Sequence, residues 1–371
     1  MTHFSTDEIF MRRALALARH GRGRTAPNPP VGAVVVQDGM VVGKGWHRQA
    51  GTPHAEVLAL QAAKTRARGA TLYVTLEPCA HEGRTPPCTR AILAAGVTRV
   101  VYAVADPHPL AAGGARELIQ AGVMVTGGVL ESAARELLAP FFSAVLRGRP
   151  FVELKMAMTL DGRTADRHGQ SRTITSSESL RQVHRMRDIA DAVLVGGRTL
   201  ELDDPLLTCR LGRLGRDPAR VILDPWLRHA DPGQRIFRSG SSTIFLCVLD
   251  RVEASRRAAF SGDNVRFLEF SPDENGWMRP EEVLTRLLEQ GIHHVLVEGG
   301  ARTAGSLMER GVVDRLHFVY APRLMLDGAA TGVLDSGQVR LMNDLMPVQR
   351  MRSRRVGPDL WVVADTTPPE R

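Results

Sequence analysis

Three residues in the first third of the chain are of the types that bind zinc. His54 stands in a His-Ala-Glu motif, Cys79 follows a proline, and Cys88 comes after a loop of eight residues. One imidazole and two thiolates suit tetrahedral zinc, and three protein ligands leave a fourth position for water, which is typical of a catalytic site. Zinc supplies hydroxide near neutral pH. Glu56, two residues after His54, would carry a proton from that water to a leaving amine.

The order of these residues indicates a deaminase. His-x-Glu followed by Pro-Cys and a second Cys is the signature of zinc nucleobase deaminases, in which two residues separate the cysteines. The eight-residue loop of this chain carries His81 and Arg84 and is stiffened by two prolines. Such a loop suits an anionic or hydrogen-bonding substrate, although an ordinary solvated surface loop stays open as the alternative.

Longer motifs around these residues resemble the bifunctional deaminase–reductases of riboflavin biosynthesis. They are Thr-Ala-Pro-Asn-Pro-Pro-Val-Gly, His-Ala-Glu-Val, Leu-Glu-Pro-Cys-Ala-His and Gly-Arg-Thr-Pro-Pro-Cys, at residues 25–32, 54–57, 76–81 and 83–88. That family joins a cytidine-deaminase-like zinc domain to a dihydrofolate-reductase-like domain. The resemblance implies that Asn28, His81 and Arg84 hold the pyrimidine and its ribose phosphate. Ala33 and His108 depart from the family, which usually has Cys and Asn at these positions.

Three motifs in the second half match the reductase half of the same family. They begin with Lys-Met-Ala-Met, Asp-Asp-Pro-Leu and Glu-Gly-Gly-Ala, at residues 155–163, 203–210 and 298–306. The last runs from a predicted strand into a predicted helix, where free backbone N–H groups and the helix dipole can bind a phosphate. Because the stretch lacks the G-x-G-x-x-G spacing, a plain strand–helix turn stays open as the alternative.

The resemblance implies NADPH as the cofactor and hydride delivery to the ribose C1′. The residues expected to line the cofactor are Ala157, Thr173, Thr199, Asp203, Gly299, Gly300, Ala301, Arg302, Thr303, Ala304, Gly305 and Ser306. The residues expected to meet the substrate are Ser171, Arg187, Leu207, Arg210 and Glu298. Lys155 is the expected catalytic residue, acting as a point charge or proton donor. Arg187 and Arg210 suit a phosphate by charge and geometry.

The reductase half also departs from the family. Thr173 replaces a usual Trp, the stretch at residues 197–202 replaces a usual Gly-Thr-Val-Leu-Ala, and Leu138 replaces a linker Asn. These changes leave open a chain that deaminates but has a degenerate second domain.

The elements that position these residues alternate between helix and strand. A capping box at residues 5–8 begins a helix, a hairpin turn at Asp38-Gly39 follows the apolar stretch 31–36, and helices and strands alternate after residue 150. One helix is expected over residues 131–146. We expect an α/β protein of two domains: a zinc-dependent pyrimidine deaminase at residues 1–147 and an NADPH-dependent reductase at residues 148–371.

Composition favours a globular protein of the cytoplasm. The chain has 371 residues, 43% hydrophobic and 24% charged, with no apolar run long enough to span a bilayer and no signal-peptide pattern at its start. Four cysteines are too few for a disulfide scaffold, so Cys209 and Cys247 are expected to be buried apolar residues.

The expected function is deamination of 2,5-diamino-6-ribosylamino-4(3H)-pyrimidinone 5′-phosphate and then reduction of the ribosyl group of 5-amino-6-(5-phosphoribosylamino)uracil. The first 150 residues hold 17 Lys and Arg against 10 Asp and Glu, which also invites a nucleic-acid deaminase acting on tRNA. The long loop between the cysteines and a second domain without a nucleic-acid motif speak against that alternative. We therefore expect a phosphorylated small substrate, zinc, NADPH and self-association into a homo-oligomer, without nucleic acid or membrane.

Overall fold

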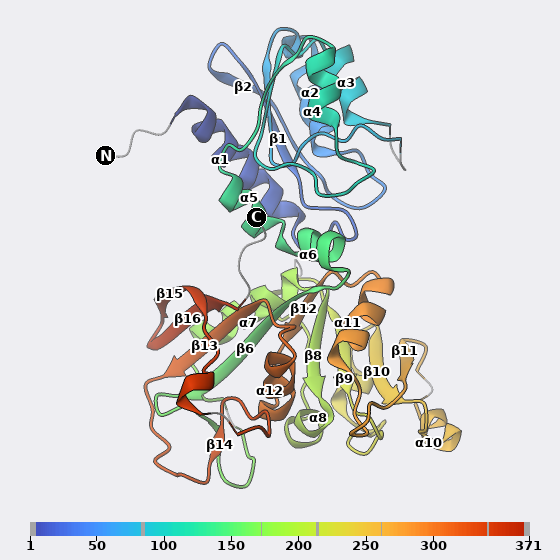
Figure 1. Cartoon of the computed structure of the whole chain (residues 1–371), viewed down its shortest axis with the longest axis vertical. Helices are drawn as coiled ribbons and strands as arrows, with labels where there is room; N and C mark the ends of the chain where they lie inside the picture. Colours follow the sequence, from blue (N-terminus) through green and yellow to red (C-terminus); the bar gives the residue numbers. More distant parts are fainter. Residues whose placement is uncertain are drawn as a thin grey trace. The chain divides into compact units, whose positions relative to one another are not determined.

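The chain divides into two compact units, Met1–Gly148 and Arg149–Arg371. The computed structural model describes residues 5–82, 86–171, 173–212, 215–260, 262–339 and 341–366 (Figure 1). Each unit has its own sheet and its own hydrophobic core. Among the described residues, no helix is both long and apolar enough to cross a membrane.

The first unit is built on a five-stranded sheet in the order β2-β1-β3-β4-β5. Its strands are β1 Gly32–Gln37, β2 Met40–Trp46, β3 Thr71–Val74, β4 Arg99–Tyr102 and β5 Met124–Thr126. β1 runs antiparallel to β2 and β3, whereas β3, β4 and β5 are parallel. The predicted hairpin turn is confirmed, because Asp38 and Gly39 both have positive φ and Gln37 pairs with Met40.

Helices pack closely on both faces of this sheet because glycines stand opposite them. A Cβ at Gly32 would strike the backbone of α1 (Thr6–Ala18), and one at Gly43 would strike α2 (Ala55–Ala63). In the β1–β2 register Gly43 pairs with Val35, which points to the face opposite Gly32. α1 and α2 therefore cover opposite faces of the sheet. The further helices of this unit are η1 Arg19–Gly21, η2 Lys64–Ala67, α3 Cys88–Ala94 and α4 Gly114–Gln120.

The single helix expected over residues 131–146 is wrong. Two helices, α5 Glu131–Leu137 and α6 Ala139–Arg147, occupy that stretch. Leu138 leaves the helical conformation between them, with φ −95° and ψ 7°, and a proline occupies the first turn of α6, where its missing N–H costs nothing. Gly148 ends α6 with a positive φ.

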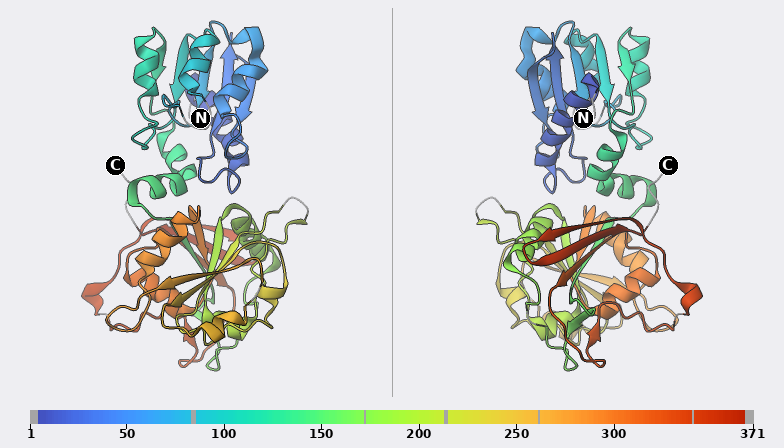
Figure 2. Two further views of the ribbon diagram at one scale, coloured as in Figure 1. Left: turned by 90° about the vertical axis from the view of Figure 1, so that its right-hand side faces the viewer. Right: turned by 90° about the vertical axis from the view of Figure 1, so that its left-hand side faces the viewer.

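The second unit contains a nine-stranded sheet in the order β11-β10-β9-β8-β12-β6-β13-β16-β15, together with a two-stranded sheet of β7 and β14. Figure 2 shows the ribbon from two opposite sides. Strands β11 to β13 of that order are parallel, and β16 and β15 are added antiparallel. The α/β class is thus confirmed in both units. The strands are β6 Phe151–Thr159, β7 Arg163–Ala165, β8 Ala192–Gly196, β9 Ala219–Leu223, β10 Ile244–Leu249, β11 Val265–Phe270, β12 His294–Val297, β13 Arg315–Ala321, β14 Thr331–Gly332, β15 Gln349–Val356 and β16 Asp359–Asp365.

Helices cover both faces of the large sheet. α11 (Pro280–Glu289) and α12 (Ala301–Glu309) pack on one face through Leu284, Leu287 and Leu307. α7 (Ser177–Ile189) packs on the other through Val183 against Trp361. The short helices are α8 Gly197–Asp203, α9 Arg235–Arg238, α10 Ala254–Ala258 and η4 Met342–Asp344.

The carboxyl ends of three neighbouring parallel strands meet at one edge of this sheet. β8, β12 and β6 lie side by side, and α8 and α12 begin directly after β8 and β12. Ligands of α/β sheets bind in the crevice outside such strand ends. The fold therefore brings the motifs at residues 155–163 and 298–306 to one place.

Candidate functional site

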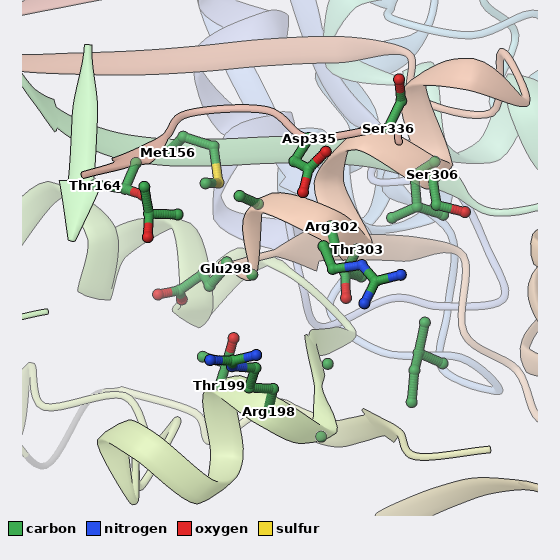
Figure 3. Close-up of a pocket in the computed structure, with 18 of the residues that line it drawn as sticks. Met156, Thr164, Arg198, Thr199, Glu298, Arg302, Thr303, Ser306, Asp335 and Ser336 are labelled. Atoms are coloured by element: carbon green, nitrogen blue, oxygen red, sulfur yellow. The ribbon is translucent and has the colours of Figure 1, made fainter. Parts of the chain in front are cut away.

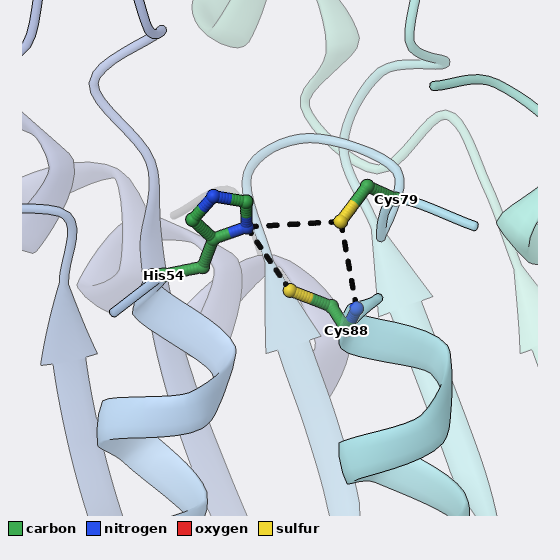
Figure 4. Close-up of side chains that lie close together, drawn as sticks. All are labelled: His54, Cys79 and Cys88. Carbon is green, nitrogen blue, oxygen red and sulfur yellow. Dashed lines mark hydrogen bonds between the residues drawn. The ribbon is translucent and has the colours of Figure 1, made fainter. Parts of the chain in front are cut away.

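The three predicted zinc ligands converge at the carboxyl end of β3. His54 precedes α2, Cys79 lies in the loop after β3, and Cys88 is the first residue of α3 (Figure 4). The Nδ1 atom of His54 lies 3.2 Å from Sγ of Cys88 and 3.7 Å from Sγ of Cys79, and all three atoms lie within 4.8 Å of one another. Tetrahedral zinc would place its nitrogen and sulfur ligands about 3.6 Å apart. The donor set fits this metal.

The local charges favour a thiolate. The pKa of Cys79 is lowered by hydrogen bonds from the Cys88 thiol, from His54 and from the backbone N–H of Cys88, which lies 3.4 Å from its sulfur. The hydrogen bond of the Cys88 thiol to Cys79, together with burial, raises the pKa of Cys88 well above its usual value, so Cys79 is the thiolate of the pair. Thiolate is the form that binds metal.

Glu56 lies beside this cluster in the first turn of α2 and is only 4% exposed. Burial raises the pKa of its carboxyl group, although the His54 charge and the Cys88 thiol partly oppose the rise. A carboxyl group with a raised pKa can both accept and return a proton near neutral pH. The structure thus brings the predicted proton carrier to the predicted metal site.

The predicted Asn28 is held by a histidine that sequence reasoning missed. Its side-chain nitrogen lies 3.0 Å from Nε2 of His47, whose Nδ1 lies 3.2 Å from the carbonyl oxygen of Pro53. Because that carbonyl only accepts, Nδ1 of His47 carries the proton and Nε2 accepts from Asn28. His47 is buried and packs edge-on against the His54 ring. The only signal in the sequence was its place shortly before the His-Ala-Glu motif.

The loop between the cysteines is only partly described. His81 is exposed, and Arg84 lies outside the described residues. On the other side of Cys79, the Glu77 carboxylate accepts from the backbone N–H groups of Asp106, Gly113 and Ala115. Glu77 therefore ties the segment that contains His108 to the strand end that carries Cys79.

The second unit has a cavity of about 1570 Å³ at the strand ends of β6, β8 and β12 (Figure 3). The predicted residues that line it are Lys155, Ala157, Ser171, Thr173, Thr199, Asp203, Glu298, Gly299, Gly300, Ala301, Arg302, Thr303 and Ser306. Ordinary ligand pockets measure about 300–1,000 Å³. The cavity therefore has room for a dinucleotide beside a second substrate.

Five predicted residues do not line this cavity. Arg187 lies behind Glu298, Leu207 is buried in the core, and the backbone N–H of Arg210 donates to His184. Ala304 is fully buried on the core side of α12, and a Cβ at Gly305 would strike the backbone of Asp335. Helical periodicity explains the last two, because residues 304 and 305 face away from the turn that precedes the helix.

Glu298, which lines the cavity, belongs to a buried ion pair. The Glu298 carboxylate accepts from Nε of Arg187 at 2.5 Å and from its Nη2 at 2.8 Å, and Nη1 of Arg187 donates to the carbonyl of Thr208 at 2.9 Å. Burial alone would raise the pKa of Glu298, but Arg187 and Lys155 beside it lower that pKa below its usual value. Burial lowers the pKa of Lys155, and Glu298 partly restores it.

The turn before α12 presents free backbone N–H groups, as a phosphate cradle would. Gly299 and Gly300 have φ of +117° and +79°, and a Cβ at Gly300 would lie 2.9 Å from Oγ1 of Thr199. Within the described part of the chain, the backbone N–H groups of Gly300, Ala301, Arg302 and Thr303 have no protein acceptor. Four such groups at a helix start suit the diphosphate of a dinucleotide. Nearby, the Ser171 hydroxyl donates to Asp203 at 2.7 Å.

Two family models together match most of the chain. Residues 4–104 match the cytidine and deoxycytidylate deaminase zinc-binding region, and residues 150–362 match the RibD C-terminal domain. These matches confirm the predicted order of a deaminase-like zinc domain and a reductase domain.

Curated and solved proteins match over nearly the full length. The riboflavin biosynthesis protein RibD of Aquifex aeolicus is 42% identical over 96% of this chain and 97% of its own, and that of Escherichia coli K12 is 40% identical over 95% and 98%. The crystal structure of a diaminohydroxyphosphoribosylaminopyrimidine deaminase/5-amino-6-(5-phosphoribosylamino)uracil reductase from Thermotoga maritima superposes with a TM-score of 0.86 at 36% identity, over 98% of this chain and 99% of that one. The chain therefore belongs to the RibD family of riboflavin biosynthesis proteins.

Proposed function

We propose that the chain deaminates 2,5-diamino-6-ribosylamino-4(3H)-pyrimidinone 5′-phosphate and then reduces the ribosyl group of 5-amino-6-(5-phosphoribosylamino)uracil to ribityl. The deaminase occupies residues 1–147 and the reductase residues 148–371. The observation that carries this proposal is that one chain holds a His-Cys-Cys cluster beside a buried glutamate and, in its other unit, a half-buried lysine in the cavity that contains the turn before α12. The cofactors are zinc and NADPH.

In the deaminase, His54, Cys79 and Cys88 hold the metal. Zinc supplies, when bound, the activation of water for hydrolysis. Glu56 takes a proton at its carboxylate and returns it to the leaving amino group, so that ammonia departs and a carbonyl oxygen replaces it. Asn28, oriented by His47, binds the pyrimidine edge. His81 and Arg84 hold the ribose phosphate.

In the reductase, Lys155 acts beside the ribose carbon that is reduced. NADPH supplies the hydride when it is bound. Lys155 offers its ammonium group as the proton donor, since burial lowers its pKa and so eases proton release, while the Glu298 charge partly opposes that fall. Three Arg187 nitrogens already donate to Glu298 and Thr208, so Arg187 chiefly orients Glu298 and has only its remaining Nη hydrogens for the substrate. Ser171 lies on the substrate side, and Ala157, Thr173, Thr199 and Asp203 lie on the cofactor side, whereas Leu207 and Arg210 do not line the cavity.

A coupled assay on the pyrimidine ribotide tests both steps. Ammonia release should come first, and the fall of NADPH absorbance should require the deaminated product. If ammonia is released but NADPH is not oxidised, even when the aminouracil ribotide is supplied directly, only the deaminase activity of the proposal would stand. Tight RNA binding that weakens steeply with salt would instead favour a nucleic-acid deaminase.

Self-association is a further part of the proposed function. β15 is the edge strand of the large sheet, and large apolar side chains are exposed on it and just before it: Leu341, Met342, Leu345, Met346, Val348 and Met351. An exposed edge strand with apolar neighbours is a template for pairing with another chain. We propose that a second copy covers this edge. Sedimentation should give a dimer or larger, and Met351→Lys should shift it toward monomer.

The cytoplasm is the proposed compartment. All four cysteines are free of disulfide bonds, including the partly exposed Cys209, as is usual for proteins of a reducing compartment. Fractionation of cells that express the chain should place it with cytoplasmic enzymes.

A phosphorylated ribotide is the proposed binding partner of the protein, and nucleic acid is not.

A further inference from the structure

A buried histidine of α7 lies beside the Arg187–Glu298 pair but belongs to none of the motifs of the reaction. His184 is only 4% exposed and stands one helical turn before Arg187. Its Nδ1 atom accepts from the backbone N–H of Arg210 at 3.2 Å. The histidine therefore holds the backbone of the segment that ends at Arg210.

That segment, residues 203–210, connects the cavity to α7. It begins at Asp203, which ends α8 and lines the cavity. Two residues within it, Asp204 and Leu207, have φ of +39° and +52°. Left-handed backbone of this kind is unfavourable for a residue that carries a Cβ, and it persists only where the surrounding structure holds it. The conformation of the segment therefore depends on contacts from outside it.

α7 supplies three such contacts. The carbonyl oxygen of His184 accepts from the Cys209 thiol at 3.5 Å, which adds to the contact at Nδ1. Nη1 of Arg187 donates to the Thr208 carbonyl at 2.9 Å, while its Nε and Nη2 donate to Glu298. The Thr208 carbonyl thus fixes the guanidinium that in turn fixes the Glu298 carboxylate. A shift of the segment would take this anchor away from Arg187.

Only the neutral form of the His184 ring can make the contact at Nδ1. A neutral imidazole has one accepting nitrogen, whereas the cation has none. Burial lowers the pKa of His184, and so do the Arg187 charge on the same helix and the Arg210 charge on the segment. The Glu298 carboxylate and a hydrogen bond to the Thr208 backbone partly oppose this fall. The ring is therefore neutral near pH 7, and a proton taken up in acid would break the contact.

We propose that His184 is a positioning residue of the reductase: its neutral ring holds the segment on α7, and the segment anchors Arg187 on Glu298. Loss of this contact lowers kcat for reduction and leaves the deaminase unaffected, because the zinc cluster lies in the other unit. Protonation of the ring makes reduction sensitive to acid. This inference rests on the proposed reductase function.

Two replacements of His184 separate its contact from its charge. His184→Asn keeps an accepting oxygen at the position of Nδ1 but does not titrate, whereas His184→Leu removes the acceptor. NADPH oxidation is followed from about pH 5 to about pH 8 with the aminouracil ribotide supplied directly, and ammonia release by the same preparation is the internal reference. At about pH 8, His184→Leu should lower kcat for reduction about fivefold to tenfold, the usual effect of one lost hydrogen bond in a buried place, and change KM for NADPH less than twofold.

The loss of reduction in acid is a readout that a merely structural role would not move. The substrate phosphate also titrates near pH 6, but in every variant alike, so the ratio of His184→Asn to wild type is compared. This ratio should rise at least about twofold as pH falls to about 5, toward the factor lost in His184→Leu, because both changes report the same contact. If His184→Leu also loses NADPH binding by calorimetry, its fold is disturbed and the His184→Asn profile alone decides.

His293 provides the matched control. Burial lowers its pKa as well, but it does not line the cavity, and its backbone N–H donates to Asp191. His293→Asn should keep both kcat and the wild-type fall of activity in acid. The same fall in His184→Asn, or wild-type kcat in His184→Leu, would overturn the positioning role and leave the reductase function standing. If the wild type itself does not oxidise NADPH on the aminouracil ribotide, the proposed reductase function fails and the positioning role with it.

Discussion

Replacing Glu298 by glutamine would leave the buried Arg187 and the half-buried Lys155 without their anion. Glu298→Gln keeps the shape of the side chain but removes the charge that Arg187 contacts at 2.5 and 2.8 Å. Both partners of the pair are about nine-tenths buried. Breaking such a pair from one side costs about 3–5 kcal/mol, because the remaining charge stays desolvated. For a unit of this size, each kcal/mol lowers the melting temperature by about 2–4 °C, so we expect a fall of at least about 6 °C.

The pH dependence of this loss follows from the sign of the Glu298 shift. Its pKa in the folded protein lies below the usual value, so the unfolded chain takes up the proton first as pH falls. The stabilising effect of the carboxylate is therefore complete above a pH of about 4.3 and disappears as pH falls through the lower folded pKa. The stability gap between wild type and Glu298→Gln should be widest near pH 7 and should narrow in acid.

Scanning calorimetry of the full chain, with both activities followed, measures these effects. Reduction should be lost, while ammonia release is kept. Glu289→Gln is the control, since Glu289 pairs with Arg286 at 3.4 Å on an exposed face of α11 and such pairs contribute at most about 1 kcal/mol. If both variants lowered the melting temperature equally, or if Glu298→Gln left reduction intact, the argument from the buried pair would be refuted.

The remaining predictions concern single steps of the two reactions. Glu56→Gln should keep zinc, measured by atomic absorption, but lose ammonia release by about 10²–10⁴-fold; surviving release would exclude Glu56 as the proton carrier. Lys155→Ala should abolish NADPH oxidation alone, and an equal loss of both activities would indicate misfolding instead. Gly300→Ala should weaken NADPH binding measured by calorimetry, because its Cβ would lie 2.9 Å from Oγ1 of Thr199 and its φ is +79°; the strain costs about 1–2 kcal/mol, and unchanged affinity would contradict the cradle.

The zinc site could be predicted because its residues carry strong local signals. His54 and Glu56 are neighbours in sequence, and Cys79 and Cys88 flank one loop, so residue types and order alone indicated the metal. The strands of the parallel sheet could also be predicted from the sequence. β12 spans His294–Val297 as the apolar run indicates, since a strand buried on both faces is continuously hydrophobic.

β15 could not be predicted, because its sequence carries no strand pattern. Gln349–Val356 contains four arginines and is exposed at every position except the last. Its conformation depends on pairing with β16, a contact that local sequence does not encode. The two-helix break at Leu138 was missed for a related reason, since apolar residues continue through it.

The contacts of the reductase site depend on the fold rather than on spacing. Arg187 and Glu298 meet across a separation of 111 residues, because Met186 of α7 packs against the core cluster that contains Leu296 of β12, and Glu298 directly follows β12. The resemblance to the family pointed to both residues, but only the structure shows that Arg187 donates hydrogen bonds to Glu298 and to the carbonyl of Thr208. His47 and His184 were missed because single imidazole side chains carry no motif of their own.

The altered stretch at residues 197–202 is compatible with an active reductase. Two residues of this stretch are closely packed. A Cβ at Gly197 would lie 3.0 Å from Asp224, and Thr199 faces Gly300. Of the changed side chains, Glu201 is turned outward to pair with His229 at 2.7 Å. Arg198, Thr199 and Leu202 of this stretch line the cavity, whereas Glu201 does not. A degenerate second domain would be expected to lose the glycines and the Arg187–Glu298 pair first, and this chain retains both.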